Sequence, residues 1–300
     1  MPDIAFVKPA LPRAGALVLP LAEEAPLAGL AAQADQATGG AISRGLEAAK
    51  FKGRKGQSAT LWAPGAGLSK VVAIGLGKAG DLAAPDAEAA GGSIAGAVAQ
   101  EREAVVAADG LAAPLAAALA MGVALKSYRF DRYRTKEKEE DKPKIERVAV
   151  AVADAAKAKA AYAPMQAVAD GVFLTRDLVS EPPNVLTPAE CAERCKALTK
   201  LGVEVEILGP KEMKKLGFGA LLGVAQGSVQ EPRMVVMRLN GASKGKKAAK
   251  PLAFIGKGVT FDTGGISIKP AAGMEDMKWD MAGAGTVIGL MAALAGRKAK

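Results

Sequence analysis

The chain has 300 residues, of which half are hydrophobic, and it carries a formal net charge of +9 and no histidine. This length suits two domains of ordinary size, at roughly 150 residues each. Aromatic residues make up only 4%, so alanine, valine, leucine and glycine must supply most of the core. The first residues carry charges and several prolines, which does not fit a secretory signal, and no uninterrupted apolar run reaches about 18 residues, so no membrane span is indicated.

Strands are expected to alternate with helices in the first half of the chain. The apolar run 71–77 predicts a buried strand followed by a turn, and residues 147–152 predict a second strand. Between them, residues 86–102 are expected to be helical, and the charge-free, alanine-rich segment 110–125 is expected to be a buried helix. A helix of several turns is expected over residues 155–178. This alternation is typical of an α/β fold with a mostly parallel sheet.

A domain boundary is expected near residue 182, where two consecutive prolines break the chain. Thr187 is a favourable helix N-cap and Pro188 a favourable first helical residue, with Glu190 in position to complete a capping box. We therefore expect an N-terminal α/β domain over residues 1–155, a linker helix over 156–182 and a second α/β domain over 183–300.

The second half of the chain predicts further strands and helices. Strands are expected over residues 203–208 and 233–239, and helices over 210–216 and 282–294. Residues 251–256 predict a buried strand that delivers the next two residues to its carboxyl end. In open α/β sheets, ligands bind at that end of the strands.

Cys191 and Cys195 are the only cysteines, and they are spaced i, i+4 on a predicted helix. No other soft metal ligand lies near them in the sequence. We therefore interpret them as two reduced thiols rather than as a redox or metal site. Such use of cysteine fits a reducing cytoplasm.

The excess positive charge is concentrated in short runs at residues 52–55, 132–144 and 244–250. Solvated loop ends are one interpretation of these runs, and a phosphate-binding surface is the other. The runs lack regularly interleaved aromatic residues, and no DNA- or RNA-binding signature accompanies them, which favours loop ends. A DNA-binding, architectural role remains the alternative, and it predicts retention on DNA that weakens steeply with salt.

The most informative segment covers residues 257–280 and reads KGVTFDTGGISIKPAAGMEDMKWD. It contains Lys257, Asp262, Lys269 and Asp280, and its paired glycines let the chain turn sharply and approach a ligand closely. Aspartate oxygens suit magnesium, manganese and related ions and also bind zinc. Lysine ligates a metal only as the neutral amine, which burial and a nearby dication favour. The two lysines can therefore have different roles, one as a neutral metal ligand and one as a retained cation.

This segment closely resembles the active-site signature of the leucyl aminopeptidases, the cytosolic di-metal exopeptidases. The family pattern is Lys-Gly-x-x-Phe-Asp-Ser/Thr-Gly-Gly, then Lys-Pro, then Met-x-x-Met-Lys-x-Asp-Met-x-Gly-Ala, and every spacing matches here without a gap. Residues 128–133 resemble a segment of the family's first domain, and residues 176–184 resemble its interdomain region. The resemblance covers residues 70–300, approximately.

The resemblance implies a role for each matched residue. It implies that Lys257, Asp262 and Asp280 are ligands of two divalent metal ions, Mn or Zn. It also implies that Lys269 is the catalytic lysine, whose retained charge stabilises the oxyanion of the tetrahedral intermediate. Met277 is implied as a wall of the apolar pocket for the first side chain of the substrate, with ordinary core packing as the alternative.

The family also implies a fold, a reaction and an assembly. The expected fold is α/β, with a macro-like N-terminal domain and an aminopeptidase catalytic domain built around a mostly parallel central sheet. The expected reaction is the release of N-terminal amino acids from peptides by metal-activated water, in the cytoplasm and by a homohexamer.

One departure from the family pattern bears on activity. The family carries a second signature, Asn-Thr-Asp-Ala-Glu-Gly-Arg, which supplies two more carboxylate ligands and an arginine, and no such string occurs in this sequence. The sequence therefore holds three of five expected ligand side chains and one of two catalytic residues. We expect an incomplete catalytic domain, so that the chain by itself is an inactive fragment of an aminopeptidase.

Overall fold

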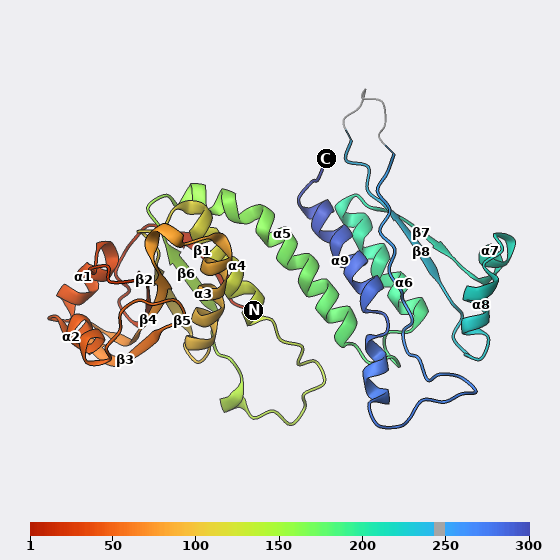
Figure 1. The fold of residues 1–300 in the computed structure, drawn as a ribbon, viewed down its shortest axis with the longest axis horizontal. Helices are drawn as coiled ribbons and strands as arrows, with labels where there is room; N and C mark the ends of the chain where they lie inside the picture. The colour runs from red at the N-terminus through yellow and green to blue at the C-terminus, as the bar shows by residue number, and fades with distance from the viewer. Residues whose placement is uncertain (243–249) are drawn as a thin grey trace. The chain divides into compact units, whose positions relative to one another are not determined.

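The computed structural model describes residues 1–242 and 250–300 and divides the chain into two compact units, Met1–Gln166 and Ala167–Lys300. In Figure 1 the first unit is coloured from red to yellow-green and the second from green to blue. The division falls inside helix α5 (Ala155–Ser180), which contains the helix expected over residues 155–178.

A six-stranded sheet with the order β1-β6-β5-β2-β4-β3 forms the centre of the first unit. Its strands are β1 (Asp3–Val7), β2 (Gly15–Ala22), β3 (Ser58–Gly65), β4 (Leu68–Gly77), β5 (Glu103–Ala107) and β6 (Arg147–Ala151). All strand pairs are parallel except the pair of edge strand β3 with β4. Strands β2 and β4 are buried along most of their length, as expected of central strands covered on both faces. The predicted α/β class with a mainly parallel sheet is confirmed.

Four helices lie wholly within the first unit, and glycines bring the backbones of α3 and α4 close together. The four helices are α1 (Gly29–Ala37), α2 (Ala41–Ala48), α3 (Ala84–Ala97) and α4 (Ala113–Ser127), with short 3-10 turns η1 (Ala79–Asp81) and η2 (Glu139–Asp141). Helix α4 is buried, as predicted. A Cβ on Gly91 of α3 would lie 1.9 Å from the Leu119 carbonyl oxygen of α4. A Cβ on Gly122 of α4 would lie 1.8 Å from the Glu88 carbonyl oxygen of α3.

Gly91→Ala is therefore expected to lower the free energy of unfolding of the first unit by about 1–3 kcal/mol, because the added methyl group forces the two helix backbones apart. Urea denaturation followed by circular dichroism measures this change. The control is Gly96→Ala in the same helix, where a Cβ meets no heavy atom within 4 Å. It should leave stability unchanged or slightly raised. Equal stability of the two variants would contradict the close α3–α4 contact.

In its described residues, the second unit combines helices with one antiparallel strand pair, β7–β8. Its elements are α6 (Pro188–Lys196), η3 (Ala197–Leu201), β7 (Glu204–Leu208), α7 (Pro210–Lys215), α8 (Gly219–Ala225), β8 (Met234–Arg238), η4 (Met274–Trp279) and α9 (Ala282–Gly296). The predicted cap of α6 is confirmed, since the Thr187 hydroxyl accepts the Glu190 N–H at 3.3 Å and Pro188 is the first helical residue. The capping box is not completed, because the Glu190 carboxylate instead accepts a hydrogen bond from Arg194 Nε at 2.8 Å.

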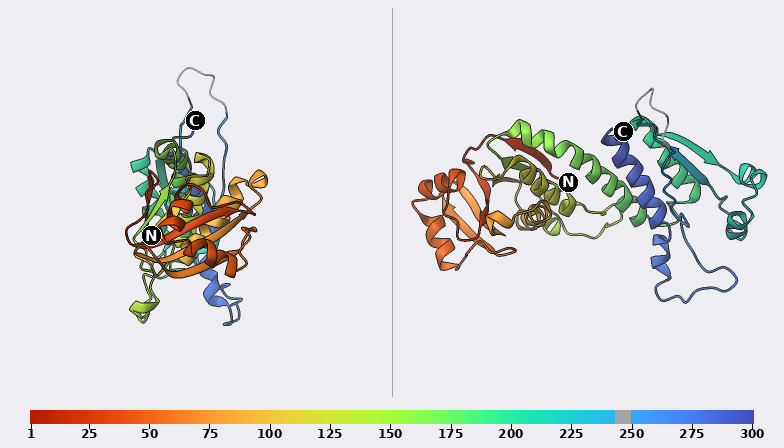
Figure 2. Two further views of the ribbon diagram at one scale, coloured as in Figure 1. Left: turned by 90° about the vertical axis from the view of Figure 1, so that its left-hand side faces the viewer. Right: turned by 45° about the horizontal axis from the view of Figure 1, so that its top comes forward.

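Helix α9 packs against the second half of α5, and the two lie side by side in Figures 1 and 2. The Thr175 hydroxyl of α5 donates to the Gly285 carbonyl of α9 at 3.0 Å. A Cβ on Gly289 would lie only 2.0 Å from that hydroxyl oxygen, so glycine is needed at the crossing. The fully buried side chain of Met281 anchors the chain immediately before α9.

One described segment, Met274–Gly296, is long and apolar enough to cross a membrane if it is judged by length and composition alone. Core helices of water-soluble proteins pass the same test. Helix α9 contributes Ile288 and Met291 to the core of the second unit, which accounts for the apolar composition of this segment.

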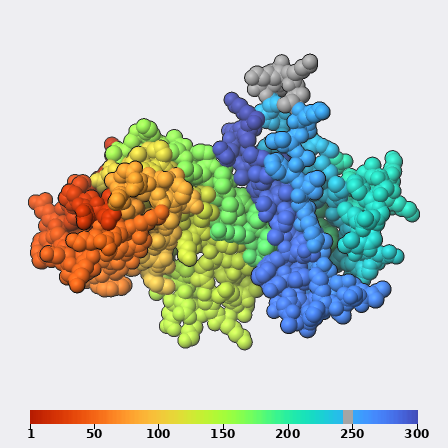
Figure 3. All heavy atoms as spheres, viewed as in Figure 1, coloured from red at the N-terminus to blue at the C-terminus, as the bar shows by residue number. Residues whose placement is uncertain are grey.

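The predicted buried strand over residues 251–256 is wrong. In the part of the chain that the structure describes, this segment joins no sheet, and Leu252 and Ile255 are 85% and 94% exposed. Figure 3 shows it, in blue, at the surface. An apolar run predicts burial only where other elements cover it, and residues 251–255 are all exposed. Lys257 is instead placed by α9, because the Ala284 N–H donates to its carbonyl oxygen at 2.8 Å.

Candidate active site

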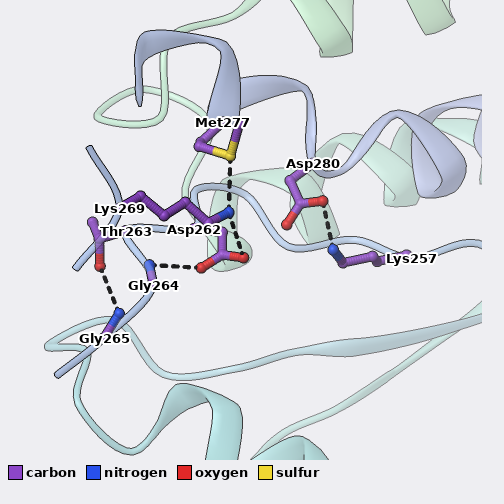
Figure 4. Close-up of polar contacts among 8 residues, drawn as sticks. All are labelled: Lys257, Asp262, Thr263, Gly264, Gly265, Lys269, Met277 and Asp280. Carbon is purple, nitrogen blue, oxygen red and sulfur yellow. Dashed lines mark hydrogen bonds and ion pairs between the residues drawn. The ribbon is translucent and has the colours of Figure 1, made fainter. Parts of the chain in front are cut away.

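Two lysine–carboxylate pairs form the centre of the candidate site (Figure 4). Lys257 Nζ lies 2.5 Å from Asp280 Oδ1, and Lys269 Nζ lies 3.0 Å from Asp262 Oδ2. All four side chains come from the segment that the sequence singled out. The structure thus pairs each of the two carboxylates expected to bind metal with one of the two expected functional lysines.

A tight loop brings Lys269 back over Asp262. Gly264 and Gly265 adopt left-handed backbone angles, with φ of +91° and +83°, which favour glycine. The Gly264 N–H donates to Asp262 Oδ1 at 2.9 Å, and the Lys269 N–H donates to the Thr263 carbonyl at 2.9 Å. These contacts close the loop and explain why the paired glycines follow so soon after the aspartate.

Asp280 is held at the junction of η4 and α9. Its backbone N–H donates to the Met277 carbonyl at 3.2 Å, and the next residue, Met281, is fully buried. One of its carboxylate oxygens, Oδ2, is buried and has no hydrogen-bond partner among the described residues. Burying an ionised oxygen without a partner is costly, and a bound cation would satisfy it.

The positive charges of the lysines reach Asp262. The hydrogen bond from Lys269 holds the pKa of the Asp262 carboxyl below its ordinary value, and the Gly264 N–H and the charge of Lys257 act in the same direction. A carboxyl whose pKa is lowered on folding stays ionised at neutral pH, and the stabilisation from its pairing is lost only as the pH falls through the lowered pKa. Asp262 is therefore an anion in any neutral solution.

The donor set fits a divalent cation only when a lysine amine is included. Carboxylate oxygens of Asp262 and Asp280 suit hard and borderline ions, and Lys257 adds one nitrogen in its neutral form. Across residues 1–242 and 250–300, no group of three or more His, Cys, Asp or Glu side chains gathers at one point. The described residues could therefore supply only part of the ligand shell of such a cation.

Met277 contacts the predicted catalytic lysine directly. Its Sδ lies 2.9 Å from Lys269 Nζ, on the 3-10 turn η4. The sequence predicted Met277 as a pocket wall and indicated no contact with Lys269, because the irregular stretch between the two residues has no helical or strand period. Only the path of the chain through that stretch brings the sulfur and the ammonium together.

The cysteine pair lies on α6, and both thiols are free. Cys195 is buried, and its hydrogen bond with Cys191 together with burial raises its pKa. The same hydrogen bond lowers the pKa of Cys191. The pair belongs to the packing of the second core, which includes Cys195 and has Cys191 against it.

Acidic neighbours neutralise several of the basic residues predicted to lie in solvated loop ends. Ion pairs join Lys142 to Glu139 (2.7 Å) and Lys138 to Glu140 (3.6 Å), and two more join Lys55 to Asp86 and Arg54 to Glu23 (3.5 Å). The run over residues 244–250 lies outside the described residues except for Lys250.

The two-unit α/β fold, with a loop of paired lysines and carboxylates after the strand pair of its second unit, is the arrangement expected from the resemblance of segment 257–280 to the leucyl aminopeptidases. Comparison with protein families agrees. Residues 173–300 match the catalytic domain of the cytosol aminopeptidase family, and residues 18–137 match its N-terminal domain. The chain belongs to the cytosol aminopeptidase family.

Individual relatives support the same assignment. A probable cytosol aminopeptidase of a Bradyrhizobium species is 54% identical over 280 residues, which cover 90% of this chain and 56% of the relative. A solved structure of a tomato leucine aminopeptidase mutant has a TM-score of 0.80 and 29% identity, covering 98% of this chain and 59% of that one. The bottromycin maturation enzyme BotP, in complex with Mn, has a TM-score of 0.71 and 27% identity, covering 95% and 56%. The chain thus spans somewhat more than half the length of these proteins.

Proposed function

We propose that the chain carries part of the site of a two-metal, leucyl-type aminopeptidase, which releases N-terminal residues from peptides. The observation that carries this proposal is Asp280, whose buried Oδ2 has no partner among the described residues while its Oδ1 faces the amine of Lys257. Membership of the cytosol aminopeptidase family supports the reaction, and the Mn in the BotP complex supports a divalent metal.

Asp262, Asp280 and Lys257 are the residues that would hold the metal ions, Mn or Zn. Their donors are two carboxylates and one amine, and Lys257 would bind as the neutral amine after its proton leaves to solvent. When bound, two divalent ions polarise the peptide carbonyl and make water a better nucleophile at neutral pH.

Lys269 would act on the reacting carbonyl through its positive charge. In the structure its ammonium is paired with Asp262. Once the Asp262 oxygens coordinate metal ions, the Lys269 ammonium would be available to donate to the carbonyl oxygen as negative charge develops there. Oriented donors of this kind typically contribute about 10²–10³-fold to turnover.

The whole activity would belong to a longer protein, because the family resemblance implies two further carboxylates and an arginine. Within this proposal, residues 1–155 form the N-terminal domain, 156–182 the linker helix and 183–300 the first part of the catalytic domain. Peptides would be the substrates. A cytoplasmic location is supported by the name of the Bradyrhizobium relative, and a homohexamer by the family resemblance alone.

The test compares two proteins, the 300-residue chain and a chimaeric aminopeptidase in which residues 1–300 are continued by the remaining part of the Bradyrhizobium relative. The chain alone is expected to bind Mn²⁺ weakly and to hydrolyse no leucyl amide, because its described ligand shell is partial. The chimaeric aminopeptidase is expected to bind Mn²⁺ more tightly and to hydrolyse the leucyl amide, and a chelator should abolish this activity. Mn²⁺ titration and a leucyl amide assay measure the two properties.

Two results would contradict the proposal. The first is robust, chelator-sensitive hydrolysis by the 300-residue chain, which would mean that other residues build a complete site. The second is a chimaeric aminopeptidase that is folded by circular dichroism but binds no Mn²⁺.

A further inference from the structure

We propose that Met277 is a positioning residue for Lys269, whose ammonium its thioether sulfur holds in place. This inference rests on the proposed role of Lys269 as the cation that faces the reacting carbonyl. It assigns Met277 a function other than that of an apolar pocket wall.

The geometry shows an ammonium held by two acceptors of different kinds (Figure 4). Lys269 Nζ lies 3.0 Å from Asp262 Oδ2 and 2.9 Å from Met277 Sδ. An ammonium has three N–H donors. Within the described residues two of them are directed at these acceptors, which leaves the third for an oxygen of a substrate.

A thioether suits this task because it is neutral. A carboxylate neutralises the ammonium that it holds, whereas a sulfur accepts a hydrogen bond and leaves the positive charge intact. If Asp262 coordinates metal ions in the active protein, Met277 Sδ is the acceptor that remains for the Lys269 ammonium. The sulfur would then direct the ammonium without reducing its charge.

The backbone holds Met277 at a defined place in the site. Turn η4 follows Gly273, which has a left-handed φ of +78°, and the Met277 carbonyl accepts the Asp280 N–H at 3.2 Å. One short turn therefore fixes both the sulfur that contacts Lys269 and the carboxylate that contacts Lys257. The Lys269–Met277 contact and the Lys257–Asp280 pair are therefore supported by the same turn.

The contact is tested in the 300-residue chain itself, by NMR of the Lys269 ammonium in protein labelled with ¹⁵N-lysine. The signal is assigned by its loss in Lys269→Arg. Met277→Leu removes the acceptor and should speed hydrogen exchange of this ammonium with water by about fivefold, whereas Met277→Gln, which has an acceptor oxygen at similar reach, should stay within about twofold of the parent. Met274→Leu, at the start of the same turn, is the matched control and should change nothing.

Kinetics of the chimaeric aminopeptidase separate positioning from pocket lining. A positioning role predicts that Met277→Leu lowers kcat by about 5- to 10-fold with KM little changed, and that Met277→Gln restores part of kcat. A pocket-wall role predicts instead that Met277→Leu is the more active of the two variants. Leucine preserves an apolar surface, whereas glutamine raises KM.

The outcomes distinguish this inference from the proposed function. Two results overturn the inference while Lys269 keeps its proposed role. One is unchanged hydrogen exchange of the Lys269 ammonium in Met277→Leu, and the other is higher activity of Met277→Leu than of Met277→Gln. Full turnover of Lys269→Ala overturns the proposed role of Lys269, and the positioning role falls with it.

Discussion

Lys269→Ala in the chimaeric aminopeptidase is expected to lower turnover of a leucyl amide by about 10²-fold or more, while its metal content stays near normal. The variant loses the donor proposed to meet the developing oxyanion, but it keeps all three proposed ligands. Because the interaction is made mainly in the transition state, kcat should fall much more than KM rises. Steady-state kinetics and elemental analysis measure the two properties.

Lys278→Ala is the matched control for Lys269→Ala. Lys278 lies in the same segment, but its ammonium sits 5.6 Å from the centre of the Trp279 ring. This variant should keep turnover within about twofold, since surface substitutions usually have small effects. Full activity of Lys269→Ala would remove Lys269 from the mechanism. Loss of metal together with activity would show that Lys269 supports the fold of the site instead.

Asp262→Asn and Asp280→Asn are each expected to weaken Mn²⁺ binding by the chimaeric aminopeptidase by at least about tenfold, because a neutral amide is a poorer ligand for a dication than a carboxylate. Asp280 carries the buried oxygen without a partner among the described residues, so its replacement should have a large effect. Mn²⁺ titration followed by electron paramagnetic resonance gives the affinity, and elemental analysis gives the stoichiometry.

Asp276→Asn provides the control for both substitutions. Asp276 lies four residues before Asp280 on η4, and its side chain is exposed. This variant should retain normal metal affinity. Unchanged metal stoichiometry in Asp262→Asn and Asp280→Asn would refute their assignment as ligands. Loss of bound metal in Asp276→Asn alone would identify Asp276 as the ligand instead.

Local signals in the sequence were sufficient to predict many of the elements, although they gave no prediction for β1, β2, β3, β5, α1, α2 or α8. The apolar run 71–77 lies within β4, and the alanine-rich segment 110–125 corresponds to the buried helix α4. Thr187 and Pro188 begin α6 as their capping chemistry predicts. These predictions succeed because periodicity, caps and turns depend on residues close together in the chain.

The predicted strand over residues 251–256 failed because an apolar run carries no information about its neighbours. A strand needs a partner for its backbone groups and a cover for its side chains. The same six residues pair with no described strand, and Ile255 is 94% exposed. The sequence pattern described a segment able to be buried, and burial itself depends on what packs against it.

The residue types and spacing of segment 257–280 are enough to indicate carboxylate and lysine chemistry with tight glycine turns, since those properties belong to the side chains themselves. Which lysine pairs with which carboxylate is decided by the folded chain, through the loop at Gly264 and the contact of Lys257 with α9. The same holds for the Met277 sulfur at Lys269 and for the buried oxygen of Asp280. Distances between side chains depend on the whole path of the backbone, which no local pattern encodes.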